Sequence, residues 1–346
     1  MVKLNNQVNM KFDKIYEKYR KKLKSKGMSI AIENEDRSFQ WAKSYGELEG
    51  DKQYFIASVT KLFATTVLLN LITEGKLSFD DRICDYLPQE YIDGFHTYRG
   101  ADYSKQLTVR HLMTQTSGLP DYFTESNVGE LYGNELLKQD QILTLDDIVR
   151  RTINMEAKFL PGSKKRAYYS DANWDIFLPI VERVSNQSIE QCYKKYIIEP
   201  LQLENTYLYI EGMEFNVPGI WIDDGIYTLP KLASAWPMSG SIISNNRDMI
   251  IFLKAFWGGK LFPYEKLKEN NTYHYTQYFP LEYGLGNMRF RYPGMPSLYG
   301  HSGATGVVCY YSPKFKIYIS ACINELDEGK VTRMLARFAH EFRKVC

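Results

Sequence analysis

The sequence predicts an α/β (α+β) protein with a mostly antiparallel β-sheet flanked by helices and an inserted, mainly helical lobe. Three observations indicate this fold class. Strand-like patterns occur near both ends of the chain, helical patterns dominate the long stretch between them, and a helical pattern closes the chain. The two strand-rich ends are therefore expected to share one sheet, with the middle of the chain packed beside it as a second layer.

The predicted domain division follows from this order of elements. Residues 1–80 and 285–346 would form the sheet domain, and residues 81–284 the mainly helical domain. The chain has 346 residues, of which 44% are hydrophobic and 24% charged, a mixture that supplies a large core. The net charge of +2 gives no electrostatic reason to expect a nucleic-acid partner.

Three elements are predicted in the first 80 residues. Residues 10–25 carry apolar side chains at helical spacing, which predicts an amphipathic helix. Residues 28–47 are typical of two strands joined by a turn at Asn34–Arg37. Residues 55–74 predict an apolar helix that ends at Gly75, because glycine commonly terminates helices.

Helical patterns then continue to about residue 255. In "TLDDIVRRTINM", Thr144 is expected to cap the helix, and Asp146 and Asp147 fall in its first turn, where negative charge is favoured. After about residue 283 the pattern changes to "YGLGNMRFRY", "GVVCYYSP" and "KIYISACIN", which predict strands. The segment "GKVTRMLARFAHEFRKV" predicts the closing helix.

The cysteines and histidines predict no cofactor or metal site. The five cysteines are odd in number and form no CxxC pair, and the five histidines show no metal-ligand spacing. The first 22 residues lack the apolar core of a signal peptide, and no stretch reaches the roughly 18 apolar residues of a membrane span. A cytoplasmic protein without a membrane span is therefore expected.

The stretch "FIASVTK" places Ser58 three residues before Lys61. Residues at this spacing share one face of a helix, and a serine needs a nearby base and a site for the oxyanion before it can act as a nucleophile. Free backbone N–H groups in a first helical turn favour developing negative charge. The alternative is that Ser58 only caps the helix and that Lys61 is exposed to solvent. The apolar neighbours of Lys61 weigh against a merely solvated lysine, but the SxxK spacing by itself leaves both interpretations open.

Together with other segments, "FIASVTK" resembles the SxxK serine-hydrolase superfamily, which includes class C β-lactamases, D-alanyl-D-alanine carboxypeptidases and related esterases. The further segments are, in order along the chain, "HLMTQTSGLPDY", "FLPGSKKRAYYSDANWDIFLPIVERV", "MSGSIISNNRDMIIFL", "YGLG" and "GHSGATGV". They extend from about residue 50 to 320 in the order that the family has. The resemblance implies a two-lobed β-lactamase/transpeptidase-like fold with the active site in the cleft between the lobes.

The resemblance also implies roles for individual residues. Ser58 would be the nucleophile, Lys61 its partner, and Tyr169 the group that takes and returns the proton. Asp171 matches the third position of the family's second motif, which begins at Tyr169. The third motif and the substrate-binding or oxyanion positions comprise His301, Ser302, Gly303 and Ala304, and the N–H groups of Ser58 and Ala304 would hold the oxyanion.

Two positions depart from the β-lactamase pattern. Asp171 stands where the family has asparagine, and an ionised carboxylate only accepts hydrogen bonds. His301 stands where the family has lysine, and it carries no dependable positive charge at neutral pH. Both changes indicate weaker recruitment of a substrate carboxylate, and they point away from efficient penicillin hydrolysis.

The expected function is that of a cofactor-free serine hydrolase acting through an acyl-enzyme on a small ester, amide or peptide. One alternative is a D-alanyl-D-alanine carboxypeptidase or weak β-lactamase. Another is a non-catalytic ligand sensor or binding protein that keeps the cleft without the reaction. The sequence leaves the natural substrate and the oligomeric state open.

Overall fold

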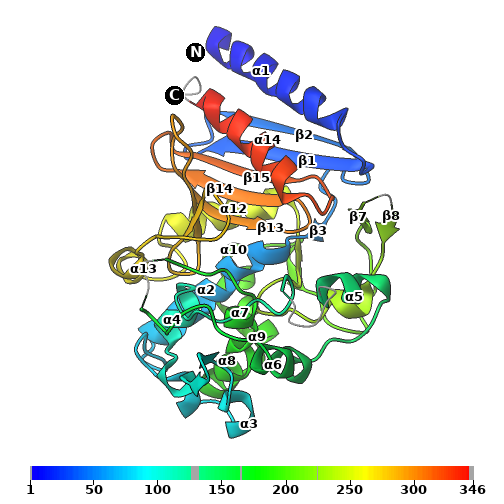
Figure 1. The fold of residues 1–346 in the computed structure, drawn as a ribbon. Coiled ribbons are helices and arrows are strands. Elements are labelled where there is room, and N and C mark those ends of the chain that lie inside the picture. Colours follow the sequence, from blue (N-terminus) through cyan, green and yellow to red (C-terminus); the bar gives the residue numbers. More distant parts are fainter. Residues whose placement is uncertain (1, 126–131, 164–165, 224, 343–346) are drawn as a thin grey trace.

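The computed structural model describes residues 2–125, 132–163, 166–223 and 225–342. Its main feature is an eight-stranded sheet in which every neighbouring pair is antiparallel (Figure 1). The strand order is β10 (His274–Tyr275), β11 (Leu281–Tyr283), β12 (Met288–Phe290), β13 (Leu298–Gly303), β14 (Val307–Ser312), β15 (Ile317–Cys322), β1 (Gly27–Asn34) and β2 (Gln40–Gly46).

The two ends of the chain meet in this sheet. β1 pairs with β15 over the register from Ser29↔Cys322 to Asn34↔Ile317, so the predicted shared sheet is confirmed. Its outer strands β10 and β11 come from residues 274–283, a stretch that the sequence assigned to the helical domain. The division into two domains remains a prediction.

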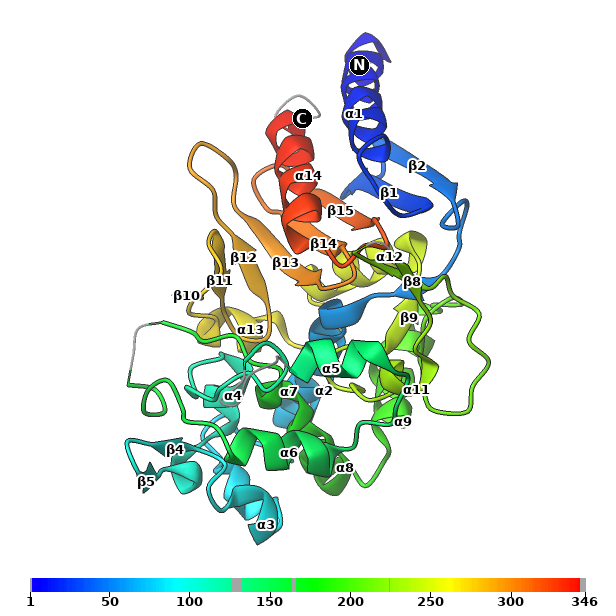
Figure 2. The same ribbon diagram turned by 45° about the vertical axis from the view of Figure 1, so that its right-hand side comes forward.

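Helices cover both faces of the sheet. α1 (Val2–Arg20) and α14 (Glu328–Glu341) pack together on one face, and α12 (Asn246–Trp257) lies against β1, β14 and β15 on the other (Figure 2). On the first face, the ring centroid of Phe12 lies 5.5 Å from that of Trp41 and 5.3 Å from that of Phe338. The predicted N-terminal helix therefore exists, but it spans residues 2–20 rather than 10–25.

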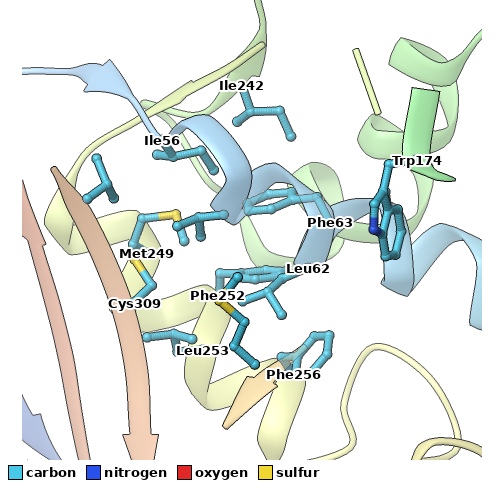
Figure 3. Close-up of a cluster of buried hydrophobic side chains, with 14 of the residues drawn as sticks. Ile56, Leu62, Phe63, Trp174, Ile242, Met249, Phe252, Leu253, Phe256 and Cys309 are labelled. Atoms are coloured by element: carbon cyan, nitrogen blue, oxygen red, sulfur yellow. The ribbon is translucent and has the colours of Figure 1, made fainter. Parts of the chain in front are cut away.

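α2 (Thr60–Thr73) lies at the centre of the molecule. Eleven of its fourteen residues are buried, because a helix that is apolar around its whole circumference has no face for solvent. The ring of Phe63 stacks on that of Phe252 of α12, with centroids 4.0 Å apart. Figure 3 shows these rings within a cluster of buried side chains that includes Trp174 and Met249.

The remaining helices lie mostly on the far side of α2 from the sheet (Figures 1 and 2). They are α3 (Gln89–Ile92), α4 (Val109–Met113), α5 (Tyr132–Lys138), α6 (Leu145–Ile153), α7 (Ala172–Asp175), α8 (Phe177–Ser185), α9 (Ile189–Tyr193), α10 (Glu199–Leu201), α11 (Pro230–Ala233) and α13 (Tyr264–Asn270). The predicted cap of α6 is confirmed, since the hydroxyl of Thr144 accepts a hydrogen bond from the N–H of Asp147. Among the described helices, none combines the length and the apolar character that a membrane crossing requires.

Short strands complete the fold. They are β3 (Tyr54–Phe55), β6 (Tyr207–Leu208) and β9 (Ile242–Ser244) in one small sheet, β4 (Thr97–Tyr98) with β5 (Ala101–Asp102), and β7 (Ile220–Ile222) with β8 (Gly225–Tyr227). The helix predicted over residues 55–74 is wrong at its start, because Phe55 belongs to β3 and a 3₁₀ turn, Ala57–Val59, precedes α2. Ala57 has a φ of 46°, which a right-handed helix excludes.

Candidate active site

Ser58 lies in the turn that joins β3 to α2. The turn is fixed on its N-terminal side, where β3 pairs with β9 and the N–H of Ile56 donates to the carbonyl of Ile242 at 2.9 Å. Ala57, just before the serine, has its left-handed backbone conformation there. Such strained residues persist only where surrounding contacts hold them, and they are frequent at functional sites.

Lys61 follows in the first turn of α2 and is completely buried. Its Nζ donates to the Oγ of Ser58 at 2.9 Å and to the carbonyl of Ser239 at 3.1 Å, and lies 2.8 Å from Oδ1 of Asp171. These three acceptors match the three N–H groups of an ammonium ion. The alternative interpretation of Lys61 as a solvent-exposed lysine is therefore wrong.

Tyr169 and Asp171 also lie against Lys61. Nζ of Lys61 lies 5.3 Å from the ring centroid of Tyr169, within the range of a cation–π contact. The same ring lies 6.1 Å from the ring of His301 and 5.7 Å from that of Tyr283, between centroids. The structure therefore brings together a hydroxyl, an amine and a phenol ring from two distant parts of the chain.

The third motif lies at the end of β13. His301 is completely buried, and burial, followed by the charge of Lys61, lowers its pKa to about 3. Its Nδ1 lies 2.6 Å from the carbonyl of Ser302, which only accepts, so Nδ1 carries the proton and donates. Nε2 is then an acceptor facing the hydroxyl of Tyr283 at 3.3 Å. His301 is thus a neutral residue of the protein interior.

Gly303 and Ala304 bring the sheet up to the turn that carries Ser58. A Cβ on Gly303 would lie 2.7 Å from the carbonyl oxygen of Ile56 and 2.9 Å from Cβ of Ala57. Glycine is therefore required for this close approach of the two backbones. Ser302 and Ala304 line the same cavity as Ser58.

This contact gives a testable expectation. The substitution Gly303→Ala should push β13 away from the turn, with a destabilisation of about 1–3 kcal/mol and a loss of catalytic efficiency on the order of 100-fold. Thermal melting and esterase kinetics measure the two effects. Gly329 in α14 meets only side-chain ends, so Gly329→Ala is the matched control. Unchanged kinetics in Gly303→Ala would show that the close approach is unimportant.

Two further carboxyl groups near Asp171 were not identified from the sequence. Asp121 accepts a hydrogen bond from the N–H of Asp171 at 3.1 Å. Asp175 accepts hydrogen bonds from the hydroxyls of Ser239 at 2.5 Å and Tyr122 at 2.8 Å. Burial, and then the charge of Asp171, raises the pKa of both buried carboxyls to about 7. For Asp175 a signal existed, because it lies four residues after Asp171 and residues at that spacing share a helix face.

A cavity of about 410 Å³ opens beside Ser58. Polar groups of Ser58, Tyr169 and Asp171 lie on its wall. Most of its lining is apolar and includes Phe55, Phe123, Leu137, Phe215, Ile220, Ile222, Tyr227, Leu229, Leu232, Trp236, Leu281 and Met288. A larger groove of about 1140 Å³ lies between β1, β2 and α12, but none of the proposed site residues lines it. The smaller cavity is therefore the candidate substrate site.

The chain is similar in sequence to known proteins. The chain is 28% identical over 212 residues to Protein flp of Staphylococcus aureus (strain MW2), a match that covers 59% of this chain and 39% of that protein. It is 27% identical over 306 residues to a putative D-alanyl-D-alanine carboxypeptidase of Escherichia coli (strain K12), covering 75% of this chain and 66% of that protein. The chain thus spans less than two thirds of the length of these relatives.

A solved structure, a D-stereospecific amidohydrolase from Streptomyces sp., superposes with a TM-score of 0.74 at 25% identity, covering 88% of this chain and 92% of that one. This likeness supports the β-lactamase/transpeptidase-like fold inferred from the sequence motifs. The sequence profile of the family described as Beta-lactamase matches residues 12–344. The chain therefore belongs to the Beta-lactamase family, a family of serine hydrolases related to penicillin-binding proteins.

Proposed function

We propose that the protein is a serine hydrolase that forms an acyl-enzyme at Ser58 with a small ester, amide or peptide. The observation that carries this proposal is the complete burial of Lys61 with its Nζ 2.9 Å from Oγ of Ser58. Even with Asp171 as its ion-pair partner at 2.8 Å, burying the ammonium of Lys61 costs desolvation free energy. A non-catalytic binding protein gains nothing from bearing that cost beside a serine hydroxyl.

The reaction begins at Oγ of Ser58, which attacks the acyl carbon of the substrate while its proton passes to the oxygen of Tyr169. In this mechanism Tyr169 acts as the phenolate, and the positive charge of Lys61 beside its ring stabilises that anion. The N–H groups of Ser58 and Ala304 hold the oxyanion. The leaving group then departs with the proton from Tyr169, and water hydrolyses the remaining ester by the same steps in reverse order.

The cavity supports a substrate with an apolar acyl group. Its lining is largely aromatic and aliphatic, which favours burial of such a group. His301 is neutral and does not line the cavity, so it does not recruit a substrate carboxylate as the lysine of the family pattern would. Esters and amides are therefore the proposed substrates. A D-alanyl-D-alanine carboxypeptidase is the second candidate, favoured by the likeness to the putative Escherichia coli enzyme.

Covalent labelling tests the nucleophile. After exposure to a fluorophosphonate, the intact protein should gain the mass of one adduct, and peptide mapping should place that adduct on Ser58. Ser58→Ala should gain none. Ser78→Ala removes an exposed serine after α2 and should label like the wild type. An unlabelled wild-type protein with every acylating probe, penicillin included, would instead favour the ligand-sensor function.

Substrate profiling tests the proposed class. Turnover of p-nitrophenyl acetate or D-alanyl p-nitroanilide should exceed turnover of nitrocefin, because the described residues that line the cavity include no lysine or arginine to bind the β-lactam carboxylate. Fast nitrocefin hydrolysis without any esterase or amidase activity would contradict the proposal.

A further inference from the structure

Two glutamine side chains hold consecutive residues of the segment that carries Tyr169. Oε1 of Gln277 accepts the N–H of Tyr169 at 2.8 Å, and its Nε2 donates to the carbonyl of the same residue at 2.9 Å. Gln115 makes the same pair of bonds with Ser170, at 3.0 Å and 3.1 Å. Each glutamine therefore pairs with one residue's backbone as a neighbouring β-strand would.

The backbone groups of residues 167–170 form hydrogen bonds to partners on alternating sides of the segment. The N–H of Ala167 donates to the carbonyl of Tyr275 in β10, and the N–H of Tyr168 donates to the carbonyl of Gln115, at 2.9 Å and 2.8 Å. Residues 167 and 169 are thus held from the side of β10, and residues 168 and 170 from the side of Gln115. In an extended chain, successive residues direct their backbone groups to opposite sides, which explains why two separate glutamines are present.

The two glutamines belong to different parts of the fold. Gln115 lies two residues after the end of α4 and is completely buried, and its Oε1 also accepts from Nδ2 of Asn173 at 2.5 Å. Gln277 is exposed and follows β10, the outermost strand of the sheet. Gln115 therefore fixes the segment within the helical layer, whereas Gln277 ties it to the edge of the sheet.

We propose that Gln277 is a positioning residue that sets Tyr169 against Ser58. This inference rests on the proposed function. Ser302 and Ala304 reach Ser58 from the sheet, and Tyr169 reaches it from a loop before α7, so the catalytic geometry depends on how that loop docks on the sheet edge. A displacement of about 1 Å at a reacting group lowers rates by as much as 100-fold.

The chemistry of the contact requires glutamine. An amide side chain offers one acceptor and one donor side by side, whereas an ionised carboxylate offers acceptors only. The substitution Gln277→Glu would keep the bond to the N–H of Tyr169 but would place negative charge against the carbonyl of the same residue.

Kinetics on p-nitrophenyl acetate tests the proposal with Gln277→Ala and Gln277→Glu. In Gln277→Ala, kcat should fall about tenfold while KM changes less than about twofold, since the cavity itself is intact. The melting temperature should stay near the wild-type value, because the side chain is exposed. In Gln277→Glu, the ratio of the variant's kcat to the wild-type kcat should rise as the pH falls towards about 4, where a carboxyl regains a proton to donate.

A matched control and a second readout keep the result interpretable. Gln89→Ala removes an exposed glutamine on α3 whose Nε2 donates to Asp93, and it should leave all values unchanged. Hydrogen exchange of a peptide containing residues 166–170 should become faster in Gln277→Ala but not in the control. Wild-type kcat and wild-type exchange in Gln277→Ala would overturn the inference.

The experiments distinguish failure of the hydrolase proposal from failure of the role assigned to Gln277. If the wild-type protein shows neither turnover nor an adduct on Ser58, the hydrolase proposal fails, and the catalytic role assigned to Gln277 fails with it. If the wild type turns over and labels while Gln277→Ala matches it in kcat and exchange, only the role of Gln277 is wrong.

Discussion

The substitution Lys61→Met is expected to remove activity and to destabilise the protein. Lys61 is completely buried, and the side chain of Asp171, its ion-pair partner, is 24% exposed. Removing one partner of a buried ion pair costs about 3–5 kcal/mol, because the other charge loses its compensation. Here the destabilisation also includes repulsion between Asp171 and the carboxyls of Asp121 and Asp175, because the charge of Asp171 already raises the pKa of both. The kcat for p-nitrophenyl acetate should fall on the order of 10⁴-fold, as for other members of a catalytic group.

A double variant separates the two effects. Lys61→Met combined with Asp171→Asn removes both charges, so most of the free energy of unfolding should return while activity stays absent. Urea unfolding and esterase kinetics on the two single variants and the double variant measure this. Activity that returns with stability in the double variant would show that Lys61 has only a structural role.

The fold was predictable where local patterns were strong. The strand-like patterns of the segments that became β1, β14 and β15 indicated a sheet shared by the two chain ends, and the register of β1 with β15 confirms it. β10 and β11 were not predicted because they have only two and three residues, too few to show a period. Their hydrogen bonds depend on the strands beside them rather than on their own residues.

The candidate site was predictable only where spacing along the chain decides proximity. Ser58 and Lys61 are three residues apart, so a turn that runs into a helix brings them together. Asp121 lies 50 residues before Asp171, and Gln277 lies 108 residues after Tyr169. No local pattern encodes such contacts, because they arise when the helical layer and the sheet edge pack against each other.

The buried carboxyls near Lys61 predict an unusual dependence of stability on pH. Asp175 is buried and its pKa is raised to about 7, whereas an aspartate in an unfolded chain has a pKa of about 3.9. Between these values the folded state binds more protons than the unfolded state, so the free energy of unfolding falls as the pH rises. The stabilising contribution of this carboxyl to the free energy of unfolding is therefore complete below about pH 4 and lost above about pH 7.

The substitution Asp175→Asn isolates this contribution, because asparagine resembles the protonated carboxyl at every pH. Relative to the wild type, the variant should gain up to about 1.4 kcal/mol of unfolding free energy per pH unit between pH 4 and 7, with no further change above. Asp80 is 80% exposed, so Asp80→Asn should keep the wild-type slope in the same urea titrations. A pH-independent difference between Asp175→Asn and wild type would mean that Asp175 is ionised throughout. Lys61 would then lie beside two neighbouring carboxylates, Asp171 and Asp175.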